Sequence, residues 1–126
     1  MAMKFQREAM SEFAITAYAQ GSISVAGTEH RASILVAHAT AATAWPVATF
    51  TDITSDAIAH ATHVQAEIVI IGTGKTFRFL KPEAMRPLID AKIGYEVMDT
   101  AAACRTYNVL LSEGRQVAAL LLVEVL

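Results

Sequence analysis

Residues 68–71 read Ile-Val-Ile-Ile and run directly into Gly72, and this short apolar segment constrains the fold more than any other part of the chain. A run of this length that stops at glycines is typical of a buried strand followed by a tight turn. Gly74 lies two residues further on, so two glycines mark the turn. We therefore expect a core strand whose carboxyl end lies at Gly72.

The segment after this turn predicts a helix and a second strand. Residues 82–92 begin with Pro82, which suits the first helical position, and a glycine lies just past their end. An extended segment follows over residues 95–98, and Asp99 or Thr100 is placed to cap another helix. The order is β-α-β-α, and the turns at the carboxyl ends of such strands border the crevice where open α/β sheets usually bind ligands.

The N-terminal half predicts a β-hairpin. Residues 22–26 and 29–36 form its strands, and Gly27-Thr28 is a two-residue loop with glycine first, which suits a type II′ turn. Residues 39–44 are small and featureless, so we predict a loop there.

Three further features complete the expected fold. Thr54 opens a helix that runs to about His63, and Trp45 is expected to pack onto the core with a partner for its indole N–H. Residues 117–123 are apolar without a break and predict a strand buried on both faces. The usual strand–helix–strand crossover makes this last strand parallel to the first core strand.

A chain of 126 residues is long enough for one domain and too short for two. We expect a flexible arm over residues 1–12 and a single α/β domain over residues 13–126. Hydrophobic residues make up 54% and charged residues only 17%, against about 25% in ordinary globular proteins. Such a composition indicates covered sheet faces, or apolar surface that a partner or a second copy buries.

Charge and hydropathy exclude two classes of protein. A net charge of −2 with scattered Lys and Arg argues against a nucleic-acid partner. The uncharged span 32–51 contains Trp45 and Pro46 and lacks the aliphatic content of a membrane helix, so no transmembrane segment is expected. The first residues match neither a secretory signal nor a mitochondrial presequence, and one cysteine forms no internal disulfide. We expect a cytoplasmic protein, since a reducing compartment fits a single unpaired cysteine.

The candidate binding crevice combines the glycine turn with the start of the last helix, and its residues are Gly72, Thr73, Gly74, Lys75, Asp99, Thr100, Cys104, Arg105 and Asn108. The turn could cradle an anion with its backbone N–H groups, although the full phosphate-loop motif is absent. The alternative is that the two glycines supply backbone angles that other residues cannot adopt. A carboxylate that caps the last helix would repel an anion from the same place.

Four side chains have alternative interpretations. Cys104 lies near the start of a helix beside Arg105, which favours a thiolate, but the interpretation that we prefer is a small buried core residue. Arg105 could hydrogen-bond the glycine turn or the chain ends, or meet a carboxylate of a partner. His60 and His63 have a spacing that can bind a metal, but no third ligand is near, so we expect surface histidines. We expect no catalytic residues, metal or cofactor.

Four segments together resemble one family: Trp45-Pro46-Val47, Gly72-Thr73-Gly74, Met98-Asp99-Thr100, and residues 103–110. It is the domain-of-unknown-function family whose mitochondrial members include respiratory complex I assembly factor 3, and the resemblance covers roughly Tyr18 to Leu122. It implies a three-layer α/β fold around a mixed sheet, which leaves the direction of the last strand open.

The resemblance also implies a non-catalytic helper in the assembly of a protein complex, because the mitochondrial members assist assembly of complex I at the inner membrane. Protein partners, among them respiratory subunits or assembly proteins, are therefore expected, and a homo-oligomer is compatible with this role. The alternative is a small-molecule or anion-binding protein, or an unrecognised enzyme, that uses the crevice at Gly72–Gly74 and Asp99–Asn108.

Overall fold

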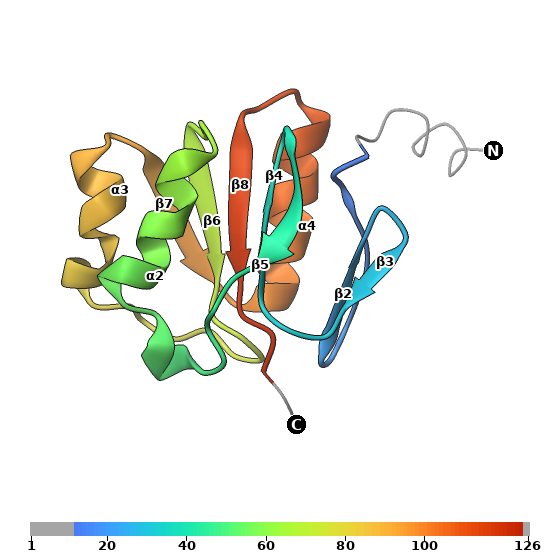
Figure 1. Cartoon of the computed structure of the whole chain (residues 1–126), viewed down its shortest axis with the longest axis horizontal. Coiled ribbons are helices and arrows are strands. Elements are labelled where there is room, and N and C mark those ends of the chain that lie inside the picture. Colours follow the sequence, from blue (N-terminus) through green and yellow to red (C-terminus); the bar gives the residue numbers. More distant parts are fainter. Residues whose placement is uncertain (1–11, 125–126) are drawn as a thin grey trace.

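A computed structural model describes residues 12–124. Its centre is a five-stranded sheet in the order β5-β4-β8-β6-β7 (Figure 1). The strands are β4 (Ile34–Ala37), β5 (Thr40–Ala44), β6 (Ile68–Gly72), β7 (Gly94–Met98) and β8 (Val117–Leu121). β8 runs parallel to β6, as the crossover rule favours, and antiparallel to β4. The sheet is therefore mixed, as expected for an α/β fold of this kind.

Helices cover one face of this sheet. They are η1 (Phe50–Asp52), α2 (Ser55–Ala59), η2 (His60–His63), η3 (Pro82–Met85) and α3 (Arg86–Asp90). Ala118 and Leu120 of β8 point into this layer, where they belong to one core cluster with Ile58 and Leu88. The Trp45 indole is buried in the same cluster and donates its N–H to the carbonyl of Ala57 at 2.9 Å, as predicted.

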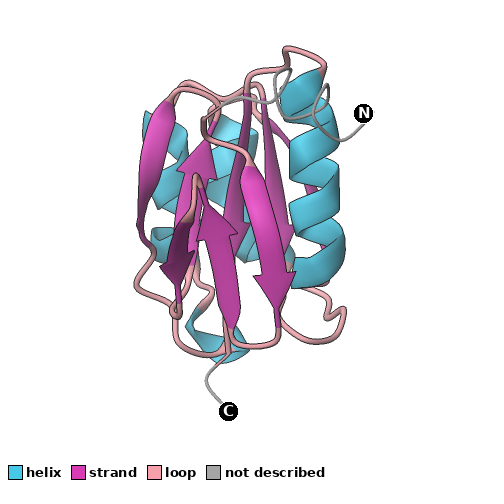
Figure 2. Cartoon of the chain, turned by 90° about the vertical axis from the view of Figure 1, so that its right-hand side faces the viewer, coloured by secondary structure: helices cyan, strands magenta, loops and turns pink. Residues whose placement is uncertain are grey.

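A helix and a small sheet cover the other face together. The helix is α4 (Thr100–Ser112), and the three-stranded sheet consists of β1 (Ile15–Ala19), β2 (Ser22–Val25) and β3 (Thr28–His30). Figure 2, viewed from the side of the small sheet, shows these strands in front with α4 beside them. Val117, Ala119 and Leu121 face this layer. All five residues of β8 are therefore buried, and the molecule has three layers.

The ends of the helices follow local rules. The Thr54 hydroxyl caps α2, and the Asp99 carboxylate caps α4 by accepting a hydrogen bond from the N–H of Ala102 at 2.9 Å. Gly114 ends α4 with a φ of +79°, and the N–H of Arg115 donates back to the carbonyl of Leu110 at 3.0 Å. This is the usual glycine-terminated helix end.

Two predictions in the N-terminal half were wrong in detail. The hairpin turn is Ala26-Gly27 rather than Gly27-Thr28, and both of its residues have positive φ, of 52° and 84°, as a type I′ turn requires. The strand after it ends at His30, and the chain then crosses to β4 in the other sheet. Residues 39–44 were predicted as a loop, but Thr40–Ala44 form β5 because β4 supplies their hydrogen-bonding partners.

Other boundaries stand as follows. The helix predicted over residues 82–92 is a 3₁₀ turn followed by α3, and it ends at Asp90, since Lys92 has a φ of +58°. Of the predicted arm, residues 1–11 lie outside the described residues. Between residues 12 and 124, no helix combines the length and the apolar character needed to cross a membrane.

Candidate functional site

Gly72 allows α4 to pack directly against the end of β6. A Cβ atom at this position would lie 2.8 Å from Oγ1 of Thr100 and 2.9 Å from its Cα, closer than real Cβ contacts allow. Of the two glycines, only Gly74 has a backbone conformation that favours glycine, with a φ of +100°. Gly72 is therefore explained by the close contact between β6 and α4, and not by unusual backbone angles as predicted.

The backbone N–H groups of the glycine turn already have partners within the chain. Thr73 donates to the carbonyl of Met98 at 2.8 Å, Gly74 to the hydroxyl of Thr100 at 2.8 Å, and Lys75 to the carboxylate of Glu124 at 3.0 Å. An anion cradle needs free N–H groups that point at the ligand. The geometry therefore favours the structural interpretation of the turn over the phosphate loop.

Two buried threonines hold the turn in place. The Thr73 hydroxyl donates to the carbonyl of Thr76 at 2.7 Å and accepts the N–H of Arg78 at 3.2 Å. The Thr100 hydroxyl accepts the N–H of Gly74 and donates to the carbonyl of Leu122, both at 2.8 Å. Both side chains are fully enclosed, so neither presents its hydroxyl to a ligand.

Asn108 and Tyr107 join α4 to the N-terminal sheet. The Asn108 amide accepts the N–H of Ile15 at 2.9 Å and donates to the carbonyl of the same residue at 2.7 Å. The Tyr107 hydroxyl donates to the carbonyl of Phe13 at 3.0 Å, and burial raises the pKa of this phenol. Asn108 therefore binds the first residue of β1, and Tyr107 binds the backbone just before that strand.

Arg105 does not hold the glycine turn. Its side chain is exposed on α4, and within residues 12–124 it makes no hydrogen bond or ion pair. None of its donors is therefore engaged by another residue of the described part of the chain.

Cys104 is a buried thiol beside this exposed arginine. It is 3% exposed, and its burial raises the pKa of the thiol to about 12, which outweighs the opposing effect of the Arg105 charge. Because thiolate is the reactive form, we expect a thiol reagent such as Ellman's reagent to modify Cys104 slowly in the folded protein and rapidly after denaturation. Rapid labelling of the folded protein at pH 8 would contradict the buried assignment.

The structure divides the predicted crevice into two hollows that share Tyr18. Gly74 and Lys75 line one, of about 310 Å³, together with Arg78 and Glu124. Hydrogen bonding from the backbone of Lys75 and the Arg78 guanidinium lowers the pKa of Glu124. The other hollow, of about 270 Å³, lies between β1 and α4 and is lined in part by Cys104, Arg105 and Asn108.

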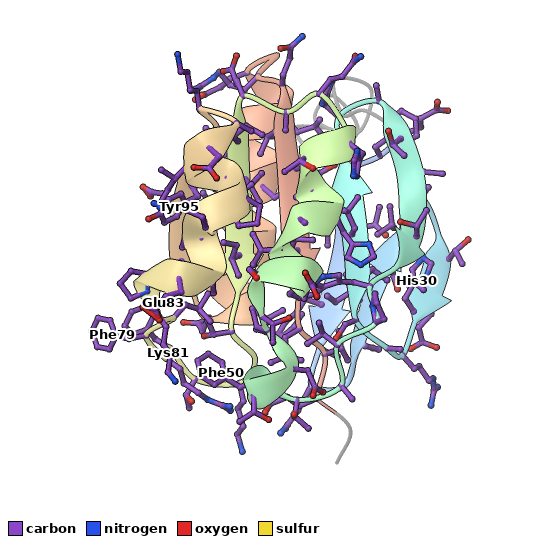
Figure 3. The ribbon with its side chains drawn as sticks, turned by 60° about the vertical axis from the view of Figure 1, so that its left-hand side comes forward. His30, Phe50, Phe79, Lys81, Glu83 and Tyr95 are labelled. Carbon is purple, nitrogen blue, oxygen red and sulfur yellow. The ribbon has the colours of Figure 1, made fainter. Side chains whose placement is uncertain are left out.

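A third surface, which the sequence analysis did not select, carries the most exposed aromatic ring of residues 12–124. Phe79 is 85% exposed and Phe77 is 46% exposed, and their rings meet edge to face with centroids 4.7 Å apart. Phe79 stands at the rim of a cleft of about 420 Å³ that Phe50 and Leu80 also line. We call Phe50, Phe77, Phe79 and Leu80 with this cleft the aromatic surface; Figure 3 shows Phe79 pointing away from the fold.

Charged groups border the aromatic surface. Arg78 lies 5.1 Å from the ring centroid of Phe50 and pairs with Glu124 at 2.9 Å. Its charge is therefore already paired within the chain. Lys81 and Glu83 line the cleft and are exposed (Figure 3). Within the part of the chain that the structure describes, neither of these two side chains forms an ion pair.

The sequence does contain a signal for this surface. Residues 75–81 read Lys-Thr-Phe-Arg-Phe-Leu-Lys, so aromatic and basic residues alternate in a segment that forms neither helix nor strand. An aromatic ring in a connecting segment, unlike one on the inner face of a strand, is not directed into the core by its secondary structure. Exposed aromatic rings of this kind are typical of interaction surfaces.

The two histidines do not gather a metal site. His60 and His63 are exposed on η2, and among the described residues no group of three or more potential metal-binding side chains occurs.

The layers described above define a three-layer α/β domain. Residues 15–122 match the family described as "Protein of unknown function (DUF498/DUF598)", and the chain belongs to this family. The predicted resemblance is thereby confirmed.

Relatives are known from several organisms. An uncharacterised protein of Rhodobacter capsulatus is 38% identical over 109 residues, which cover 86% of this chain and 82% of that protein. The NADH dehydrogenase [ubiquinone] 1 alpha subcomplex assembly factor 3 of Bos taurus is 36% identical over 80 residues, 62% of this chain. The match spans only 44% of that assembly factor.

Solved structures agree on the fold. A crystal structure from Bordetella parapertussis has a TM-score of 0.83 at 38% identity and covers 88% of this chain and 95% of that one. A solution structure from Bordetella pertussis, described as an Mth938-like domain, has a TM-score of 0.80 at 32% identity, with 89% and 86% covered.

Proposed function

We propose that this protein is a non-catalytic assembly or interaction factor that binds a partner protein through the aromatic surface. The observation that carries the proposal is the 85% exposure of Phe79 beside an apolar cleft. Full burial of a phenylalanine side chain stabilises a complex by about 1.5–3 kcal/mol. Aromatic residues that fill or border pockets are typical anchors of protein interfaces.

The relatives support the choice of partner. Because they include an assembly factor named for NADH dehydrogenase, we propose a subunit or assembly protein of a respiratory dehydrogenase, or of another membrane-associated complex. The protein would act in the bacterial cytoplasm, at the surface of the inner membrane. Arg105, which is exposed on α4 and forms no ion pair within residues 12–124, would supply a second contact to a carboxylate of the partner.

Phe79→Ser is expected to reduce capture of the partner by at least about tenfold, since the exchange removes the apolar anchor from the interface. The tagged protein would be purified gently from its own cells and the captured proteins quantified by mass spectrometry. Val109→Ser is the matched control, because Val109 is a 54% exposed apolar residue of α4 outside the aromatic surface. Equal capture by wild type and the Phe79 variant would refute the assigned surface.

A second candidate function rests on the hollow between Tyr18, Lys75 and Glu124. We propose it as the site of a small molecule that carries both an anionic and a cationic group, because a lysine and a glutamate both line it. The hollow would serve a binding protein or an enzyme. Binding to the native state raises the melting temperature, so a metabolite screen by thermal shift, repeated with Lys75→Ala, separates this function from partner docking.

A further inference from the structure

We propose that the aromatic surface also binds a second copy of this chain, in a dimer with two-fold symmetry. The inference uses the surface of the proposed function but names a different occupant, which needs no partner protein. A two-fold interface is formed by the same patch on both subunits, so the patch must be complementary to itself. Shape and charge at the aromatic surface both meet this condition.

The shape condition is met because a projecting ring and a receiving cleft lie side by side. Phe79 projects at the rim, and the cleft beside it, of about 420 Å³, has Phe50, Ile53 and Ala84 among its lining residues. A two-fold axis close to the rim places the Phe79 ring of each copy over the cleft of the other. Each copy then contributes one anchor and one pocket.

The charge condition is met by Lys81 and Glu83, which flank Pro82 at the same cleft. Both are exposed, and neither forms an ion pair within residues 12–124. Figure 3 shows both beside Phe79. In a two-fold arrangement Lys81 of one copy faces Glu83 of the other, and the pair occurs twice.

The balance of charge favours a second copy over an anionic surface. Lys81 and Glu83 have opposite signs, and the neighbouring α3 adds Arg86 and Asp90, which lie 3.8 Å apart. An anionic membrane or an acidic peptide would attract the cations of this surface and be repelled by its carboxylates. A copy of the same surface satisfies both signs at once.

The test is the mass of the purified full-length protein by analytical ultracentrifugation over a concentration series. We expect the wild type to move from the monomer mass of 13.5 kDa toward twice that value as concentration rises. Phe79→Ser should stay monomeric over the series, whereas the control Val109→Ser should match the wild type. A wild type that is monomeric at every concentration overturns the inference.

A charge exchange tests the geometry independently of the ring. Lys81→Glu and Glu83→Lys each place like charges opposite one another twice, so each variant alone should dimerise at least about tenfold more weakly than wild type. An equimolar mixture of the two restores opposite charges at both contacts. With one of the two variants uniformly labelled with nitrogen-15, native mass spectrometry should therefore detect the mixed dimer in preference to either homodimer. A mixture that associates no better than its components overturns the two-fold arrangement.

The outcomes separate this inference from the proposed function. Capture of a partner that depends on Phe79, together with a monomeric purified chain, refutes the dimer and leaves the proposed function intact. A dimer whose Phe79 variant still captures partners refutes the assigned docking surface and leaves the dimer intact. Far-ultraviolet circular dichroism checks that each variant folds, as expected for substitutions of exposed side chains.

Discussion

Replacement of Thr100 by valine is expected to lower the free energy of unfolding by about 2–6 kcal/mol. Valine keeps the shape of threonine but removes its hydroxyl, which leaves the buried N–H of Gly74 and the buried carbonyl of Leu122 without that partner. Each unsatisfied buried group costs about 1–3 kcal/mol. Whole domains are stable by only about 5–15 kcal/mol, so urea denaturation followed by circular dichroism would detect the loss easily.

Thr100→Ser is the matched control for this experiment. Serine retains the hydroxyl and loses one methyl group, so it should lie much closer to the wild type than valine does. If the valine and serine variants were equally stable, the hydroxyl bridge would not be the source of the effect.

Replacement of Gly72 by alanine is expected to cost about 1–3 kcal/mol, because the added methyl group overpacks the contact between β6 and α4. The methyl group would lie 2.9 Å from the backbone Cα of Thr100, and a helix backbone cannot rotate away as a side chain can. The measurement is the urea midpoint at constant m-value.

Gly94→Ala provides the comparison. Gly94 begins β7, and a Cβ atom there would approach nothing more closely than the carbonyl of Glu67 at 3.6 Å. Removing a glycine at a compatible position usually stabilises a protein by about 0.4–1 kcal/mol. A Gly72 variant as stable as the Gly94 variant would contradict the tight helix–strand contact.

The elements that could be predicted are those whose signal is local. β6 and β8 are apolar runs, and the caps at Thr54 and Asp99 lie a few residues from the groups that they bind. β5 could not be predicted, because Thr40–Ala44 contains only threonine and alanine and has no apolar alternation. Its strand conformation follows from pairing with β4, which is a tertiary property.

The residues of the candidate site also differ in whether their roles could be predicted from nearby sequence. The cap formed by Asp99 was predictable from its position before a helix, and so was the burial alternative for Cys104. The role of Asn108 was not, because the Ile15 groups that it binds lie 93 residues earlier in the chain. Exposure of Phe79 depends on where the connection after β6 leaves the sheet, and composition alone does not specify that route.

The position of β8 in the sheet has a consequence for synthesis on the ribosome. Among the strands of residues 12–124, β8 comes last in the sequence, and it is the central strand of its sheet, between β4 and β6. Until residues 117–121 emerge, the β4–β5 hairpin and the β6–β7 pair have no strand to join them, and their inner edges and apolar faces stay open. The nascent chain therefore passes through an aggregation-prone stage in which two strand edges are unpaired. The emergence of β8, rather than that of the earlier strands, completes the core.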